Sequence, residues 1–142
     1  SLTDNAYEPD GYGFHDVMHF ANAAVLGWSP VLRGILKCKR RSNKKVDEVE
    51  DGGRAAVIEE GIAAVAYAYA CEHNFFDGIT VVDYDLLRTV KNAARHLEVK
   101  NCSLVDWQNA ILQGYAVWRA IAKARGGRFT VDLDARTIAL VA

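Results

Sequence analysis

The sequence has little of what disulfide-stapled, disordered or fibrous proteins need. It contains only three cysteines and two prolines among 142 residues. Cys38, Cys71 and Cys102 are odd in number, far apart and never in a Cys-x-x-Cys spacing, so they predict reduced thiols rather than a disulfide framework or a zinc site. Half of the residues (51%) are apolar and there is no low-complexity segment, which excludes the disordered and fibrous classes.

The sequence also lacks a strong excess of either charge and any long apolar run. The net charge of -1 and the pI near 6.4 exclude a surface built mainly for nucleic acid or for an anionic membrane. The longest uncharged apolar stretch, residues 61–71, is well short of the roughly 20 residues that cross a bilayer. Because no signal-peptide pattern precedes the fold, we expect a cytoplasmic protein that does not bind membranes.

The patterns that are present predict a mainly α fold. We expect a single-domain helical bundle of about five helices around a long central helix, with a C-terminal β-hairpin. Residues 1–13 contain Pro9, Gly11 and Gly13 among polar groups, so they predict an irregular N-terminal lead-in. Residues 14–142 then form the helical domain and its hairpin.

Capping residues delimit the expected helices. Ser29 before Pro30 and Asp83 are N-cap signals, Ser103 with Asp106 forms a Ser-x-x-Asp capping box, and Gly27 fits a helix end. The expected helices cover residues 14–26, 30–36, about 46–73, 84–97 and 104–125.

The last third of the chain carries two further patterns. Trp107, Ile111, Tyr115 and Trp118 recur at helical spacing and predict a core stripe, or an oligomer interface if they are exposed. Residues 129–140 alternate between apolar and polar on either side of a turn and predict the hairpin. A lone hairpin is marginally stable, so we expect it to pack on the helices or on another chain.

The adjacent carboxylates Glu59 and Glu60 stand directly before the uncharged segment 61–71. A helix that is apolar all round is buried on most faces, so at least one of these carboxylates needs a partner. The candidate partners are a divalent metal ion, Arg54, or the first helix, where His15 and His19 share a face and Asp16 lies beside His15.

A metal site is one hypothesis for these acids. On a continuous helix, Glu48, Asp51 and Glu59 fall within an arc of roughly 80°. Carboxylates suit Mg²⁺ or Mn²⁺, whereas histidine ligands favour Mn²⁺, Fe²⁺ or Zn²⁺. The candidate metal ligands are Glu48, Asp51, Glu59, Glu60, His15, Asp16 and His19, and the candidate catalytic groups are His15, His19 and Glu60. The alternative is a solvated acidic face beside hydrogen-bonded structural histidines.

A basic run follows the second expected helix and indicates a second kind of site. A metal held by carboxylates and facing lysines is the arrangement that phosphoryl chemistry uses, although such a run is also typical of a solvated loop. The candidate ligand-binding residues are Lys39, Arg40, Arg41, Lys44, Lys45 and Arg54.

Several stretches together resemble a known family. They are GYGFHDVMHFANAAVLGWSPVLR, DEVEDGGRAAVIEEGIAA, YDLLRTVKNAARHLEV and WQNAILQGYAVWRAIAKARGG. From Gly11 onward the chain resembles the helical domain that follows the catalytic domain in some bacterial MazG-like nucleotide pyrophosphohydrolase proteins. The resemblance implies a nucleotide-related role and a pyrophosphohydrolase domain as a partner. Of the two acidic motifs of those catalytic domains, Glu-x-x-Glu and Glu-x-x-Asp, only the second occurs here, as Glu48-x-x-Asp51, so the resemblance does not carry catalysis with it.

Three functions remain open on the sequence. The leading hypothesis is an accessory or ligand-sensing domain that forms a homodimer and binds a nucleotide or another phosphate-bearing ligand between the first helix and residues 48–60, with or without Mg²⁺ or Mn²⁺. The first alternative is a metal-dependent nucleotide phosphohydrolase. The second is a non-catalytic homo-oligomerisation module in which the acids bond internally to Arg54 and the histidines.

Overall fold

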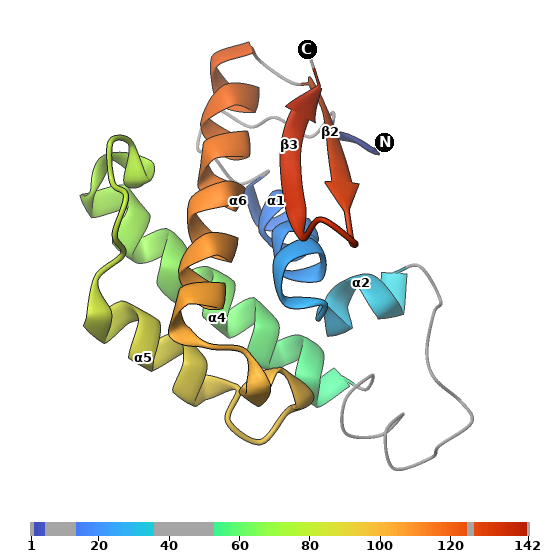
Figure 1. The fold of residues 1–142 in the computed structure, drawn as a ribbon, viewed down its shortest axis with the longest axis vertical. Helices are drawn as coiled ribbons and strands as arrows, with labels where there is room; N and C mark the ends of the chain where they lie inside the picture. Colours follow the sequence, from blue (N-terminus) through green and yellow to red (C-terminus); the bar gives the residue numbers. More distant parts are fainter. Residues whose placement is uncertain (1, 5–13, 36–52, 125–126, 142) are drawn as a thin grey trace.

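The computed structural model describes residues 2–4, 14–35, 53–124 and 127–141, and the predicted mainly α fold is confirmed (Figure 1). The described residues contain five α-helices, three shorter helical turns and three β-strands. The α-helices are α1 (Phe14–Ala21), α2 (Pro30–Ile35), α4 (Gly53–Glu72), α5 (Tyr84–Ala93) and α6 (Leu104–Ala124). The shorter turns are a π-helical turn η1 (Asn22–Leu26) and the 3₁₀ turns η2 (Asn74–Phe76) and η3 (Glu98–Asn101), and the strands are β1 (Leu2–Asp4), β2 (Gly127–Asp132) and β3 (Thr137–Val141).

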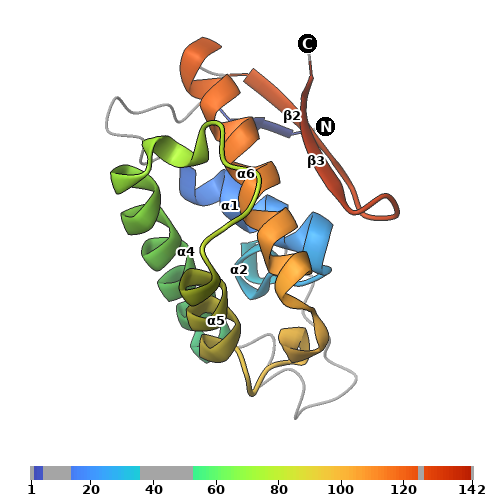
Figure 2. The same ribbon diagram turned by 60° about the vertical axis from the view of Figure 1, so that its left-hand side comes forward.

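Helix α6 stands between the sheet and the α4–α5 pair, as Figures 1 and 2 show. Helix α1 lies against α6 and also touches α4, and β3 packs on α6 beside η1. The short helix α2 packs against α4. This arrangement brings the end of α1, the start of α2 and the first half of α4 together at one place in the fold.

The core is centred on α6. Trp107, Ile111 and Tyr115 are fully buried and Trp118 is half-buried, which confirms the predicted core stripe. Gly114 lies on the same helix, where an added Cβ would be 3.1 Å from the Cβ of Ala21 on α1. The two helices therefore pack so closely that a side chain at this position would require Ala21 to move.

The predicted caps are present. Gly27 has a left-handed backbone (φ 65°) at the end of η1. The carboxylate of Asp83 accepts the backbone N–H of Leu86 at 3.0 Å. Ser103 and Asp106 form the reciprocal capping box, with the N–H of Ser103 donating to Asp106 at 2.8 Å and the N–H of Asp106 donating to the Ser103 hydroxyl at 3.1 Å.

Two helices end differently from the prediction. The expected helix 14–26 is helical throughout, but its last five residues, Asn22–Leu26, form a π-helical turn. Helix α5 ends at Ala93, four residues before the predicted end at Leu97, and the chain continues in turns in which the N–H of Leu97 bonds to the carbonyl of Ala94. The apolar spacing extends past the helix because Ala94 and Leu97 are buried even though they lie in turns.

The three strands form one antiparallel sheet in the order β1-β2-β3. Strands β2 and β3 are the predicted hairpin, which is confirmed. The predicted irregular lead-in is wrong for residues 2–4, because Leu2 pairs with Phe129 and the segment adds a third strand to the edge of β2. A segment of three residues is too short to show the alternating side-chain pattern of a strand. Its extended structure is set by its pairing with β2.

The hairpin is fixed to the helices by polar contacts, as expected for strands that are unstable alone. Arg136 in its turn donates from Nε to the carbonyl of Val25 at 2.7 Å and contacts the carboxylate of Asp106 at 3.3 Å. The N–H of Ile138 donates to the side chain of Gln113 at 3.1 Å. A backbone carbonyl of η1 and side chains of α6 thus hold the turn and strand β3.

The remaining predictions concern the cysteines and membrane-spanning helices. Cys71 and Cys102 are free thiols, as predicted, and Cys38 lies outside the described residues. Among the described helices, none is both long enough and apolar enough to cross a membrane.

Candidate functional site

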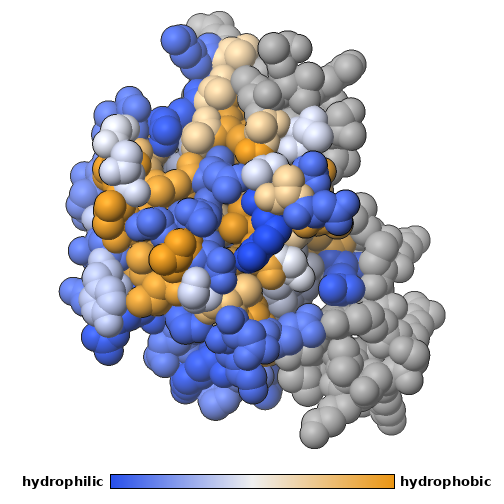
Figure 3. Space-filling model, viewed as in Figure 1, coloured by the Kyte–Doolittle hydropathy of each residue, from blue (hydrophilic) through white to orange (hydrophobic). Residues whose placement is uncertain are grey.

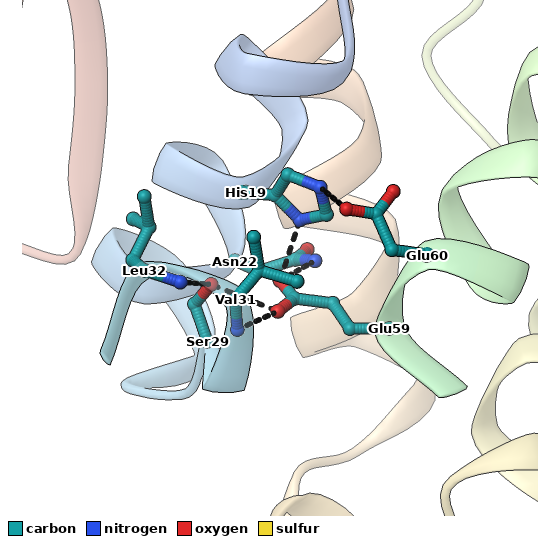
Figure 4. A network of polar contacts seen from close by, with 7 residues as sticks. All are labelled: His19, Asn22, Ser29, Val31, Leu32, Glu59 and Glu60. Atoms are coloured by element: carbon teal, nitrogen blue, oxygen red, sulfur yellow. Dashed lines mark hydrogen bonds and ion pairs between the residues drawn. The ribbon is translucent and has the colours of Figure 1, made fainter. Parts of the chain in front are cut away.

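Glu59 lies on the inner face of α4 and is fully buried. The buried positions of this helix recur at helical spacing and are mostly small: Ala55, Glu59, Ile62, Ala63, Ala66 and Ala70. Because the alanines have short side chains, α4 approaches its neighbours closely, and the carboxylate of Glu59 reaches the end of α1 and the start of α2 (Figure 4).

Four donor groups surround the Glu59 carboxylate. Oε1 accepts the hydroxyl of Ser29 at 2.9 Å and the backbone N–H of Val31 at 3.0 Å. Oε2 accepts the amide of Asn22 at 3.0 Å and contacts Nδ1 of His19 at 3.0 Å. The Nδ1 contact is short but poorly aligned, so it is an ion-pair contact rather than a directional hydrogen bond. Each oxygen of the carboxylate therefore faces two donor groups.

The start of α2 is built to present donors to this carboxylate. The hydroxyl oxygen of Ser29 accepts the N–H of Leu32 at 3.2 Å, which confirms the predicted N-cap, and its O–H then remains to donate to Glu59. Pro30 takes the first helical position, where no N–H is needed, and the next N–H, that of Val31, also points at Glu59. The buried negative charge therefore lies at the positive end of a short helix.

His19 lies between the two adjacent glutamates of α4. Its Nδ1 contacts Glu59 at 3.0 Å and its Nε2 is 3.1 Å from Oε1 of Glu60. Burial alone lowers the pKa of His19, but the close contacts with the carboxylates of Glu59 and Glu60 and their negative charges outweigh burial and raise it above the ordinary value of 6.5. Of the candidate partners that the sequence offers for these acids, the first helix is the one that contacts both, through His19. A protonated imidazole can donate to both carboxylates at once.

The two glutamates differ in exposure. Glu59 has no exposed side-chain surface, whereas 49% of the Glu60 side chain is exposed. Arg54, the other predicted partner, is exposed and is not among the groups that contact Glu59. The first helix, rather than Arg54, therefore supplies the charge that faces the buried carboxylate.

Most of the remaining predicted site residues lie outside the described part of the chain. This applies to the basic run and to the acids before α4, and for two residues of α1 only the backbone is described. The residues concerned are Lys39, Arg40, Arg41, Lys44, Lys45, Glu48 and Asp51, and, for their side chains, His15 and Asp16.

Metal ligation is constrained by the contacts of Glu59. Within the described residues, no group of three or more histidine, cysteine, aspartate or glutamate side chains is arranged to hold a metal ion. Both oxygens of Glu59 already face donors, and a cation there would have to displace N–H and O–H groups. Mg²⁺ or Mn²⁺ binding that uses Glu48, Asp51, His15 and Asp16 stays a prediction.

Sequence reasoning missed Asn22, Ser29 and Val31 as partners of Glu59. Asn22 follows His19 by three residues and so shares its side of the helix, which is a signal that the spacing contained. Its amide must present the NH₂ group to Glu59, because a carboxylate accepts and cannot donate. The sequence predicts Ser29 as a helix N-cap, and that role alone accounts for a serine before Pro30. Its second role as a donor to Glu59 therefore has no signal of its own in the sequence.

The outer face of α4 is more exposed than the sequence predicts. Val57 and Val65 are 70% and 44% exposed. Together with Ile58 they line a groove of about 360 Å³ whose other wall is Val90 and Ala93 of α5. Since the buried face of α4 consists mainly of alanine, the two faces have similar hydropathy and the sequence does not show which one is buried.

A second, larger cleft lies beside α5. Its volume is about 970 Å³, and its lining includes the cations Arg88, Lys91, Arg95 and Lys100 and the single carboxylate Asp85. Figure 3 shows hydrophilic side chains gathered over the lower part of the molecule, where the end of α5 and its connection to α6 lie. No sequence prediction singled out this group, because its cations are spread over thirteen positions.

Comparison with known proteins supports the resemblance that the sequence shows. No curated protein and no solved structure matches this chain. A family model does match, and it covers the whole of residues 1–142. On the strength of that match, the chain belongs to the family described as the MazG C-terminal domain.

Proposed function

We propose that this chain is a non-catalytic accessory domain that binds a nucleotide or another phosphate-bearing ligand, and that Glu59, His19 and Glu60 stabilise its fold. The proposal that the domain is non-catalytic rests on the contacts of Glu59, whose two oxygens face four donor groups in the protein core. A general base or a metal ligand needs a lone pair directed at the substrate or the ion. Glu59 has none to offer.

Two observations support the phosphate-bearing ligand. The family context is that of proteins that act on nucleotides, as the sequence resemblance implies. The cleft beside α5 adds a concentration of cations in the described part of the chain. The basic run at residues 37–45 and Arg54 are further candidates for the same role.

Calorimetry and a turnover assay on the full chain test this function. We expect saturable binding of a nucleoside triphosphate and no release of phosphate or pyrophosphate, with or without Mg²⁺ or Mn²⁺. Glu60→Gln should leave binding unchanged, and Glu72→Gln, an exposed glutamate at the end of the same helix, is the matched control. Turnover that depends on a metal and disappears in Glu60→Gln would instead establish the phosphohydrolase alternative.

The exposed face of α4 favours a second function, homo-oligomerisation. Val57 and Val65 are the most exposed large apolar residues of this helix, and the groove beside them is apolar. A second copy of the chain would cover both, and Val57→Glu with Val65→Glu should then convert a dimer to a monomer in sedimentation velocity. Val105→Glu, at a valine of α6 that is 61% exposed, is the control that should not. A wild-type monomer at high concentration contradicts this function.

A further inference from the structure

We infer that the cleft beside α5 is the binding site for an oligophosphate group, meaning a chain of two or three linked phosphates. This inference rests on the proposed function and gives it a location and a ligand class. The site is formed by Arg88, Lys91 and Arg95 from α5 and the turn after it, and by Lys100 from η3.

Helical spacing brings the cations of α5 together. Arg88, Lys91 and Arg95 are separated by three and four residues, so they project from the same side of the helix and of the turn that continues it. Lys100 lies in η3, in the connection between α5 and α6, and lines the cleft from there. The cleft is therefore cationic on two walls.

Lys91 fixes the geometry of the second wall. Its ammonium donates to the backbone carbonyl of Lys100 at 2.8 Å and to that of Cys102 at 2.6 Å. These bonds hold η3 and the start of α6 against α5. They use two of the three N–H groups of the ammonium, and both acceptors are neutral, so the positive charge of Lys91 remains uncompensated.

The other cations also lack carboxylate partners. Among the described residues, none of the four forms an ion pair with an aspartate or glutamate. Arg88 lies over the ring of Tyr84 at 5.7 Å, and Arg95 donates to the carbonyl of Asn92 at 3.0 Å. Each guanidinium therefore retains most of its five donors for a ligand.

Cations that have a structural role in this protein are paired differently. Arg119 contacts the carboxylate of Asp77 at 3.9 Å, and Arg136 contacts that of Asp106 at 3.3 Å. Each also donates to a backbone carbonyl of another element. Among the described residues, Arg119 and Arg136 are thus paired with carboxylates, whereas the four cations of the cleft are not.

The charge and the size of the cleft select the ligand class. Four cations and one carboxylate leave three positive charges, which match two or three phosphates better than one. The volume of about 970 Å³ is at the upper end of the range for small-ligand sites, and Ala93 and Leu104 add apolar surface. Free oligophosphates and nucleoside triphosphates share this chemistry.

Calorimetry with inorganic tripolyphosphate tests the site. We expect Arg88→Gln with Arg95→Gln to weaken binding at least tenfold at about 0.1 M salt, where exposed charges more than about 10 Å apart are largely screened. Lys123→Gln, which removes one charge near the other end of α6, roughly 28 Å away along the helix, should bind like the wild type. The replaced residues are exposed, so thermal unfolding should show that all variants fold.

The other ligands separate the possible outcomes. Tighter binding of a nucleoside triphosphate than of tripolyphosphate, lost in the double variant, supports the site and adds a contact to the base or sugar. Equal binding of the two supports recognition of phosphates alone. If the wild type binds a nucleotide and the double variant binds it equally well, the site is wrong while the proposed function stands. If the wild type binds neither compound, both proposals fail, and tighter binding of a short single-stranded DNA overturns the oligophosphate assignment.

Discussion

Glu59 lies in the core with donor groups on both of its oxygens, whereas Arg88, Arg95 and Lys100 lie at the surface with no carboxylate partner in the described part of the chain. The two regions differ because water reaches the cleft cations and does not reach Glu59. A buried charge that is not fully compensated destabilises the fold by several kcal/mol, so a charge that remains in the core must be saturated. A surface charge is compensated by water, and it can exchange that water for a ligand. In this protein the buried charges of Glu59 and His19 are paired within the fold, and the exposed cations of the cleft are the ones that we propose for binding.

The largest effect is expected from removing the buried carboxylate. Glu59→Ala leaves His19, Asn22, Ser29 and the N–H of Val31 without their acceptor, and breaking such a buried pair costs about 3–5 kcal/mol. The midpoint of thermal unfolding should fall by more than about 10 °C. Glu72→Ala, at an exposed position of α4, should change it little. A Glu59→Ala protein as stable as the wild type would remove the distinction between the two regions.

The next effect concerns the position of α1 and of η1 after it, which carry His19 and Asn22, two of the partners of Glu59. Gly114→Val places methyl groups where even a Cβ lies 3.1 Å from Ala21, and such overpacking costs about 1–3 kcal/mol. Gly61→Val is the control, since an added Cβ there meets nothing within 4 Å. Urea unfolding should show a loss for Gly114→Val only. Tripolyphosphate binding by the folded Gly114→Val protein should be unchanged, because α1 does not line the cleft.

A smaller effect is expected from pH. The pKa of His19 is raised in the folded protein, because Glu59 and Glu60 outweigh the effect of burial. The imidazole therefore binds its proton more tightly in the folded chain than in the unfolded one, and protonation of His19 stabilises the fold. This contribution is complete below pH about 6.5, the unfolded value, and is lost as the pH rises through the raised folded pKa. Stability measured by urea unfolding should therefore fall as the pH increases across that window.

Two histidine variants identify the source of that pH dependence. His19→Gln should abolish the fall in stability, whereas His96→Gln, at an exposed histidine in the turn after α5, should retain it. Stability of the wild type that rises with pH over the same window would contradict the assigned protonation of His19.

The smallest effect on stability is expected in the cleft. Arg95→Gln removes one exposed charge and one bond to a neighbouring carbonyl, so the free energy of unfolding should change by less than about 0.5 kcal/mol. Loss of stability comparable to that of Glu59→Ala would mean that the cleft cations are structural.

The sequence predicted the elements better than it predicted their surroundings. Caps such as Asp83 and the Ser103 box act within a few residues, so their residue types are sufficient to locate helix ends. Strand β1 depends on an edge more than a hundred residues away, and no local pattern specifies it. The exposure of Val57 depends on which face of an evenly apolar helix meets α1, and that is decided by tertiary packing.

The candidate site shows the same limit. The need for a partner at Glu59 followed from the uncharged segment after it, and the choice of the first helix was among the alternatives. The backbone N–H of Val31 could not be identified, because every residue except proline carries that donor and only the folded chain shows which one faces the carboxylate.

The π-helical turn Asn22–Leu26 sets the rotation between the donors at the end of the first helix, His19 and Asn22, and those at the start of α2, Ser29 and Val31. Its closing bond, from the N–H of Gly27 to the carbonyl of Asn22, spans one residue more than an α-helical bond. Deleting Ala23 would restore α-helical spacing and rotate Ser29 and Val31 by about 100° relative to His19. We expect that deletion to lower the unfolding temperature as much as Glu59→Ala does, with every donor still in the sequence. The recognition of the buried carboxylate is thus encoded in a count of residues as well as in their types.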